Sequence, residues 1–149
     1  MSHESKTSVV FQFFNEIGII EQLARNRVDK TLPHGLKLSQ FSVLNHFVRL
    51  GEESSPARLA QAFQVTKGAM TNTLSRLEAL EFLTITPDPN DGRAKRVRIT
   101  AAGRAAQKEC IEALGPGLRE IEAAIDLETL SDCLPLLERI RVYLDENRK

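Results

Sequence analysis

The chain has 149 residues, of which 42% are hydrophobic and 27% are charged, and its formal net charge at pH 7 is zero. This composition is typical of a globular protein with one domain or two small subdomains. The sequence contains no run of about 20 apolar residues, as a membrane span requires, and no charged-then-apolar leader with a cleavage site. We therefore expect a cytoplasmic protein that does not enter a membrane.

The charges are unevenly distributed along the chain. Residues 37–100 carry nine cations and six anions, whereas residues 101–149 carry seven cations and ten anions. The middle of the chain is therefore the part best suited to a polyanionic partner.

Residue patterns for enzymatic or metal chemistry are missing from the sequence. Cys110, Cys133 and the three histidines match no zinc or disulfide spacing, and we interpret the two cysteines as buried structural thiols. There is no Gly-rich phosphate loop or nucleophile motif. The sequence thus predicts no catalytic residue, no cofactor and no metal site.

The first elements are helical. Apolar residues recur at three- and four-residue intervals over residues 8–31, which predicts a long amphipathic helix ended by Pro33 and Gly35. A second helix is expected to have Ser39 as its N-cap and to end at Gly51.

Two shorter helices follow. Ser55 and Pro56 are expected to open a helix through Phe63, and Thr66 is expected to cap a helix over about residues 66–80. In the helix over about residues 66–80, the inward face consists of Met70, Thr73, Leu74, Leu77 and Leu80. The outward face of the same helix consists of Lys67, Gly68, Thr71, Asn72 and Ser75. Small hydrogen-bonding side chains and a lysine suit the major groove of DNA, although they also suit any solvated helix face.

Residues 84–100 predict a basic β-hairpin. The β-prone runs 84–86 and 97–100 flank a segment of turn formers. Four cations lie on the tip and the return strand: Arg93, Lys95, Arg96 and Arg98. Such a ribbon can follow phosphates or place an arginine in a minor groove. Its position directly after two short helices favours a DNA-binding wing over a hairpin that is basic by chance.

The last segments, 101 to about 114 and 127–146, again have helical periodicity. Gly115, Pro116 and Gly117 are expected to break or sharply kink the first of these helices. The fold class predicted is mainly α with a small β-hairpin (α+β). A winged helix-turn-helix DNA-binding domain would span residues 37–100, and residues 1–36 and 101–149 would form a helical dimerisation region. A homodimer would present two reading heads about 34 Å apart, suited to a near-palindromic operator in double-stranded DNA.

The segments DPNDGRAKRVRITAAG and SPARLAQAFQVTKGAMTNTLSRLEALEFL resemble the wing and the two preceding helices of the MarR family of dimeric winged-helix transcriptional regulators. Asp91 and Arg93 match the Asp-x-Arg of the family's wing, and Gly103 matches the glycine of the Leu-Thr-x-x-Gly helix start. The resemblance implies that Arg93 enters the minor groove and that Asp91 pairs with it or orients it. The DNA-binding residues expected together from pattern and resemblance are Thr66, Lys67, Gly68, Thr71, Asn72, Ser75, Arg76, Asp91, Arg93, Lys95 and Arg96.

Two residues depart from the family's pattern. Asn72 stands where many relatives have arginine, which would change the bases that are read. Glu81 replaces the glycine that usually ends the recognition helix, so the backbone there is either left-handed at some cost or ends the helix differently. The resemblance also implies a repressor that a small aromatic or anionic effector releases from DNA; it does not identify the effector-binding residues.

Two other functional classes remain as alternatives. The winged domain could be a protein-interaction module without a DNA site of its own, in which case a partner complex would be insensitive to loss of the basic residues. An enzyme is the weakest alternative, since a wing this basic has no evident catalytic use.

Overall fold

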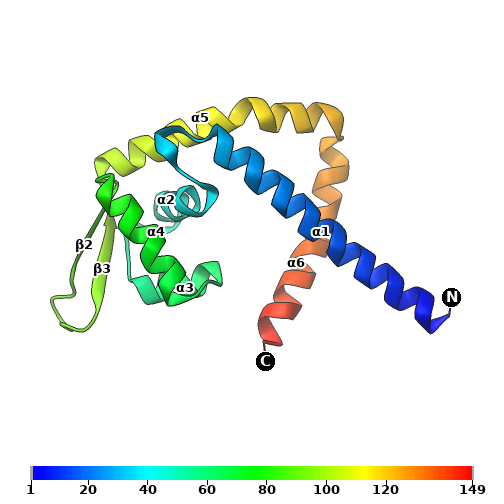
Figure 1. Ribbon diagram of the computed structural model, residues 1–149, viewed down its shortest axis with the longest axis horizontal. Helices are drawn as coiled ribbons and strands as arrows, with labels where there is room; N and C mark the ends of the chain where they lie inside the picture. The colour runs from blue at the N-terminus through cyan, green and yellow to red at the C-terminus, as the bar shows by residue number, and fades with distance from the viewer. Residues whose placement is uncertain (1, 149) are drawn as a thin grey trace. The chain divides into compact units, whose positions relative to one another are not determined.

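The computed structural model describes residues 2–148, so Met1 and Lys149, which belong to the predicted dimerisation region, lie outside the described residues. The elements in chain order are α1 (His3–Thr31), the 3-10 turn η1 (Pro33–Gly35), α2 (Leu38–Leu50), β1 (Glu53–Ser54), α3 (Pro56–Phe63), α4 (Lys67–Ala79), β2 (Leu83–Pro87), β3 (Lys95–Ile99), α5 (Ala101–Ala124) and α6 (Leu127–Glu146) (Figure 1). The predicted mainly helical fold with a small antiparallel sheet is confirmed. The chain divides into two compact units, one ending at Ala113 and the other beginning at Leu114.

The core lies between α2, α3, α4 and the sheet, which we call the winged head. The buried side chains at its centre are Phe41, Val43, Leu44, Phe47, Leu59, Ala60, Met70, Leu74, Leu77, Phe82, Leu83, Val97 and Ile99. On the helices they recur at three- and four-residue intervals, and on the strands they alternate, so each element turns one apolar side inward. This core holds α4 and the hairpin in one compact unit.

The helix-turn-helix begins and ends where its polar residues predict. The Ser55 hydroxyl accepts a hydrogen bond from the Arg58 amide at 3.2 Å, and the Thr66 hydroxyl accepts one from the Ala69 amide at 3.1 Å. Both N-caps therefore satisfy amides that lack a partner within the helix. Between the two helices Gln64 adopts a left-handed backbone with φ of 58°.

The predicted start of the second helix was wrong by two residues, both at its cap and at its first helical residue. Helix α2 begins at Leu38, and its N-cap is Lys37 rather than Ser39. The Lys37 amide donates to the Gln40 side chain at 2.9 Å, and the Leu38 amide donates to the Asp29 carboxylate of α1 at 2.7 Å. A carboxylate from another helix thus supplies the acceptor that the sequence pattern assigned to a local serine.

The hairpin is part of a three-stranded antiparallel sheet in the order β1-β3-β2. In the β2–β3 pairing Leu83 lies opposite Ile99 and Pro87 opposite Lys95, and in the β1–β3 pairing Glu53 lies opposite Arg98. The two hairpin strands contain the predicted runs, except that Thr100 lies beyond β3; β2 is one residue longer at each end, and β3 begins two residues earlier. The two-residue strand β1 was not predicted.

Glu81 follows the end of α4 in the left-handed conformation, with φ of 62°. The Phe82 amide donates to the Leu77 carbonyl at 3.0 Å and the Glu81 amide to the Glu78 carbonyl at 2.9 Å. These two hydrogen bonds form a Schellman motif, and the buried side chains of Phe82 and Leu77 accompany it. Two alternatives were predicted for Glu81, a left-handed backbone or a different end of the helix. The chain adopts the left-handed backbone.

A break or a sharp kink was expected at residues 115–117, and the break does not occur, because α5 continues through Pro116 to Ala124. A proline in a helix removes one hydrogen bond and crowds the preceding turn, which often kinks a helix without ending it. Neither Gly115 nor Gly117 has a positive φ, so the two glycines follow the helix instead of stopping it. The boundary between the compact units lies at residues 113 and 114, directly before this segment.

The two cysteines differ in environment. Cys110 is buried, and desolvation by burial, together with the neighbouring Glu109 carboxylate, raises the pKa of its thiol to about 11. Cys133 on α6 is exposed. The interpretation as a buried structural thiol is therefore confirmed for Cys110 and wrong for Cys133.

Despite the length of α1, none of the helices within residues 2–148 is long and apolar enough to cross a membrane.

Candidate DNA interface

The outward face of α4 carries the polar stripe that the sequence predicts. Lys67, Gly68, Thr71, Asn72 and Ser75 are all exposed, whereas Met70, Leu74 and Leu77 on the other side are buried. The Thr71 hydroxyl donates to the Lys67 carbonyl at 2.8 Å, which leaves its methyl group and its oxygen lone pairs available to a partner. Thr66, also exposed, fixes the start of this stripe through its cap.

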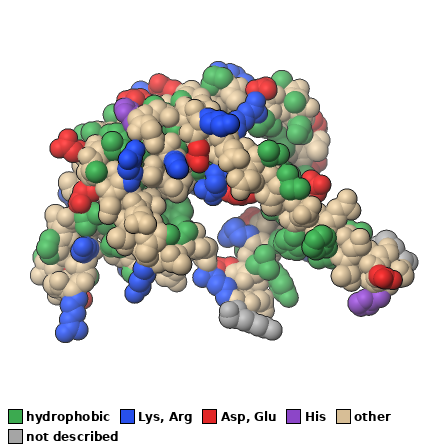
Figure 2. All heavy atoms as spheres, viewed as in Figure 1, with side chains coloured by type: hydrophobic (Ala, Val, Ile, Leu, Met, Phe, Trp, Pro, Cys, Tyr) green, Lys and Arg blue, Asp and Glu red, His purple; other side chains and the backbone are tan. Residues whose placement is uncertain are grey.

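The tip of the wing is ordered by its acidic residues. The Asp91 carboxylate accepts the Arg93 amide at 3.0 Å, and the Asp91 carbonyl accepts the Ala94 amide at 3.0 Å. The Asp88 carboxylate accepts the Asn90 amide at 2.8 Å. Asp91 therefore orients Arg93 through its main chain, which leaves the guanidinium exposed at the end of the hairpin. Figure 2 shows Lys and Arg side chains projecting from this end of the wing, at the lower left of the view.

The strand register divides the wing's cations between two faces of the sheet. Lys95 and Pro87 are paired and share the face of Val97 and Ile85, whereas Arg96 and Arg98 point to the opposite face. Sequence proximity grouped these cations as one patch. The alternation of the strand separates Lys95 from the other two.

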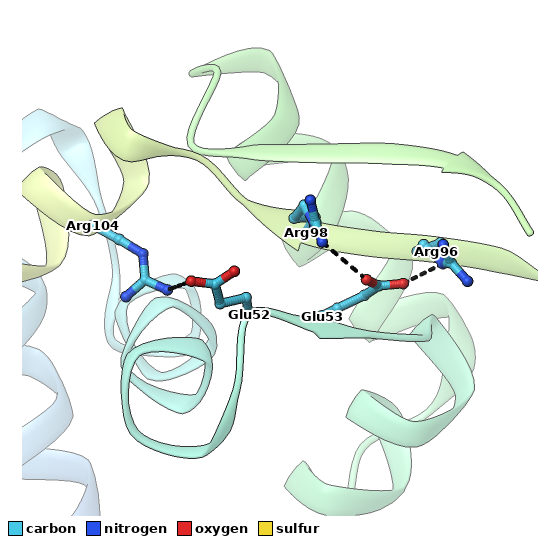
Figure 3. A network of polar contacts seen from close by, with 5 residues as sticks. All are labelled: Glu52, Glu53, Arg96, Arg98 and Arg104. Carbon is cyan, nitrogen blue, oxygen red and sulfur yellow. Dashed lines mark hydrogen bonds and ion pairs between the residues drawn. The ribbon is translucent and has the colours of Figure 1, made fainter.

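The two arginines on the opposite face contact an acidic residue of β1 (Figure 3). One Glu53 carboxylate oxygen forms an ion pair with Arg96 Nε, and the other lies 3.4 Å from Arg98 Nη2. Glu52, the preceding residue, pairs with Arg104 of α5 at 2.8 Å. Within residues 2–148, Lys67, Arg93 and Lys95 take part in no ion pair.

A groove lies between α4 and the wing. Its lining consists of Pro56, Thr71, Leu74, Ser75, Glu78, Ile85, Thr86, Pro87 and Lys95. The Glu78 carboxylate accepts the Ile85 amide at 3.2 Å, which ties the last turn of α4 to the start of the wing. The groove brings Thr71, Ser75 and Lys95, three of the predicted site residues, to one surface.

Arg76 lies apart from that groove. A Cβ atom added to Gly35 would be 3.5 Å from Arg76 Nη2, so the guanidinium lies against the turn η1. The structure thus brings most of the predicted α4 residues together on one face but directs Arg76 toward the connection between α1 and α2.

Sequence reasoning missed two acidic residues that shape the interface. Glu78 and Glu53 both hold the wing, yet neither was expected to have a role at the interface. The available signal was that each is an acid in the basic middle of the chain, close to a helix end: Glu53 follows Gly51, and Glu78 precedes the left-handed Glu81. Among the described residues, no group of three or more His, Cys, Asp or Glu side chains could hold a metal ion.

A short helix, a polar-faced second helix and a three-stranded sheet with a basic hairpin define a winged helix-turn-helix fold. The model of the MarR family matches residues 34–94, which span α2 to the tip of the wing. The multiple antibiotic resistance protein MarR of Escherichia coli is 28% identical over 119 residues, which cover 76% of this chain and 82% of that protein.

Solved structures agree with this relationship. A variant of E. coli MarR in complex with operator DNA has a TM-score of 0.77 at 25% identity, covering 88% of this chain and 94% of that one. The transcriptional regulator BldR of Sulfolobus solfataricus has a TM-score of 0.76 at 25% identity, covering 93% and 99%. The chain is therefore similar to transcriptional regulators of the MarR family, and this similarity supports a DNA-binding regulator.

Proposed function

We propose that this protein is a homodimeric, sequence-specific repressor that binds a near-palindromic operator in double-stranded DNA. One observation carries the proposal: the exposed face of α4 and the unpaired cations of the wing lie on the same compact unit. Lys67, Arg93 and Lys95, which take part in no ion pair within residues 2–148, are exposed around one polar helix face, and such a cluster of cations suits a polyanionic partner. The operator complex of the MarR relative supports the same partner for this chain.

In the proposed docking, α4 enters the major groove and the wing reaches the minor groove. Thr71, Asn72 and Ser75 would contact base edges, where the Asn72 amide is suited to bidentate hydrogen bonds with adenine. Thr66, Lys67 and Gly68 at the start of α4 would contact phosphates, which the N-terminal end of a helix attracts. Arg93, oriented by Asp91, would enter the minor groove.

The groove contributes Lys95 as a phosphate contact between these two elements. Arg76 and Arg96, which were also predicted to bind DNA, contact other parts of the protein and would reach DNA only by leaving those contacts. The proposed interface is therefore narrower than the predicted set.

The proposed dimerisation region consists of residues 1–36 and 101–149. Helices α1 and α6 contain no residue classed as buried within the described part of the chain. Nevertheless each exposes several large apolar side chains, among them Phe11, Ile20 and Leu23 on α1 and Leu127, Leu134 and Tyr143 on α6. Apolar surfaces of this kind on a protein that is soluble alone usually mark an interface. A second copy related by two-fold symmetry would cover them and place two α4 helices on one operator.

We further propose that a small aromatic or anionic effector releases the protein from DNA. Similarity to the MarR family is the support for this part of the proposal. Release requires that the effector bind two conformations with different affinities, and that the operator prefer the other conformation. This function would place the protein in the cytoplasm.

Selection from a random duplex library by the purified protein tests the proposal. We expect enrichment of a near-palindrome whose half-sites lie about one helical turn apart. Recovery of a single asymmetric site would contradict the dimeric arrangement. No enrichment at low salt, with a stable protein complex in a pull-down, would support a protein-interaction module instead.

A further inference from the structure

The network of Glu52, Glu53 and three arginines at the edge of the sheet has no place in the proposed DNA contacts. Glu53 lies on β1 directly opposite Arg98, and its carboxylate is the acceptor for both Arg96 and Arg98. Its side chain is less exposed than either arginine, at 32% compared with 39% and 60%. In Figure 3 the carboxylate lies between the two guanidinium groups along the return strand of the wing.

This arrangement lowers the charge that the wing can present to DNA. The hairpin and its tip carry the cations Arg93, Lys95, Arg96 and Arg98, but a carboxylate holds the last two on the face opposite Lys95. An arginine that is paired with a carboxylate within its own protein neutralises a phosphate only if that pair is broken. Each such release would add one phosphate contact and one unit of salt dependence.

We propose that Glu53 is a positioning residue that withholds Arg96 from DNA and thereby limits sequence-independent affinity. The inference rests on the proposed DNA-binding function and deepens it. Phosphate contacts strengthen binding to every sequence, whereas base contacts distinguish one sequence from another. Keeping Arg96 paired therefore favours the operator over the excess of unrelated DNA.

The test compares Glu53→Gln with wild type on an unrelated duplex over a series of salt concentrations. The substitution keeps the size of the side chain and removes the charge that holds Arg96. Arg98 is held less closely, at 3.4 Å, and its side chain is already 60% exposed, so the expected gain is one phosphate contact per wing, from Arg96. In a dimer the slope of log K against log salt should therefore steepen by about 2, and the affinity lost between 50 and 200 mM salt should increase roughly ten-fold. The ratio of operator to unrelated affinity should fall.

Glu52→Gln is the matched control. It removes the same charge from the adjacent residue, but its partner Arg104 lies on α5 rather than on the wing. The control should leave the slope near that of wild type, and the double variant Glu53→Gln with Arg96→Gln should return the slope to the wild-type value.

An unchanged or shallower slope for Glu53→Gln would overturn the proposal, and so would an equal effect of Glu52→Gln. If the wild-type protein shows no salt-sensitive binding to any duplex, the proposed function itself fails. In that case retention on a cation exchanger still tests the pairing, because Glu53→Gln should elute later than Glu52→Gln if it frees a wing arginine. Elution of the two variants at the same salt would contradict the withholding role independently of DNA.

Discussion

Replacing Gly103 by alanine is expected to destabilise the winged head, because the first turn of α5 packs directly against the backbone that leads into the wing. A Cβ atom at this position would lie 2.2 Å from the Phe82 carbonyl oxygen and 2.9 Å from Ile99 Cγ1. Ordinary contact begins near 3.4 Å, so the backbone would have to move by about 1 Å. The Phe82 carbonyl cannot move freely, since it accepts the Thr100 amide at 3.1 Å.

The magnitude follows from three effects. Overpacking against a well-packed site costs about 1–3 kcal/mol, and weakening the hydrogen bond from Thr100 to Phe82 costs about 0.5–1.5 kcal/mol. Alanine offsets about 1 kcal/mol of this through its higher helix propensity. We expect a net loss of about 1–3 kcal/mol in the free energy of unfolding, which for a chain of this length lowers Tm by about 3–10 °C.

Urea and thermal unfolding followed by circular dichroism would measure the loss. Gly117→Ala is the matched control, since Gly117 lies in the same helix and a Cβ there would meet nothing within 4 Å. That variant should be at least as stable as wild type. If Gly103→Ala proves as stable as Gly117→Ala, the close approach of α5 to the wing is not what requires glycine.

Three further predictions concern the wing, the helix end and the thiols. Arg93→Ala should weaken operator binding by about 1–3 kcal/mol in an anisotropy titration. The control Lys108→Ala removes an equal charge from α5 and should have little effect on operator affinity. If the two variants lose the same affinity, Arg93 has no specific role in groove recognition. Glu81→Gly should raise the free energy of unfolding by about 0.5–1 kcal/mol. Glycine removes the steric cost of the left-handed backbone, and this gain exceeds the conformational entropy that glycine adds to the unfolded chain. A decrease in stability to urea would refute this account of the helix end. At pH 8 an alkylating reagent should label Cys133 in the folded protein and both cysteines after denaturation. In the folded protein a pKa of about 11 keeps the buried Cys110 thiol protonated and therefore unreactive. If mass spectrometry shows that Cys110 is labelled as fast as Cys133 in the folded state, its burial is contradicted.

The elements predicted correctly from sequence are those set by local chemistry. Ser55 and Thr66 cap their helices with their own hydroxyls, and the turn formers between β2 and β3 predict the hairpin without reference to the rest of the chain. The left-handed backbone at Glu81 was one of two predicted alternatives, and it is the one that allows the Phe82 amide to bond to the Leu77 carbonyl while the Phe82 side chain is buried. Tertiary packing decided this case.

The features that sequence reasoning missed depend on partners distant in the chain. Strand β1 has two residues and exists through its pairing with β3, where Glu53 and Arg98 are separated by 45 positions. The division of the wing's cations follows from strand register, in which a shift of one residue exchanges the two faces. Likewise, the Asp29 carboxylate that binds the start of α2 comes from another helix. Single-sequence patterns carry none of this information.

The central claim is that α4 and the wing bind DNA through Lys67, Arg93 and Lys95, and a salt series with an enriched duplex tests it most directly. Six such contacts in a dimer predict a slope of log K against log salt of about −5, together with clearly tighter binding than to a scrambled duplex of equal length. A flat salt response with equal affinity for the two duplexes would contradict the account.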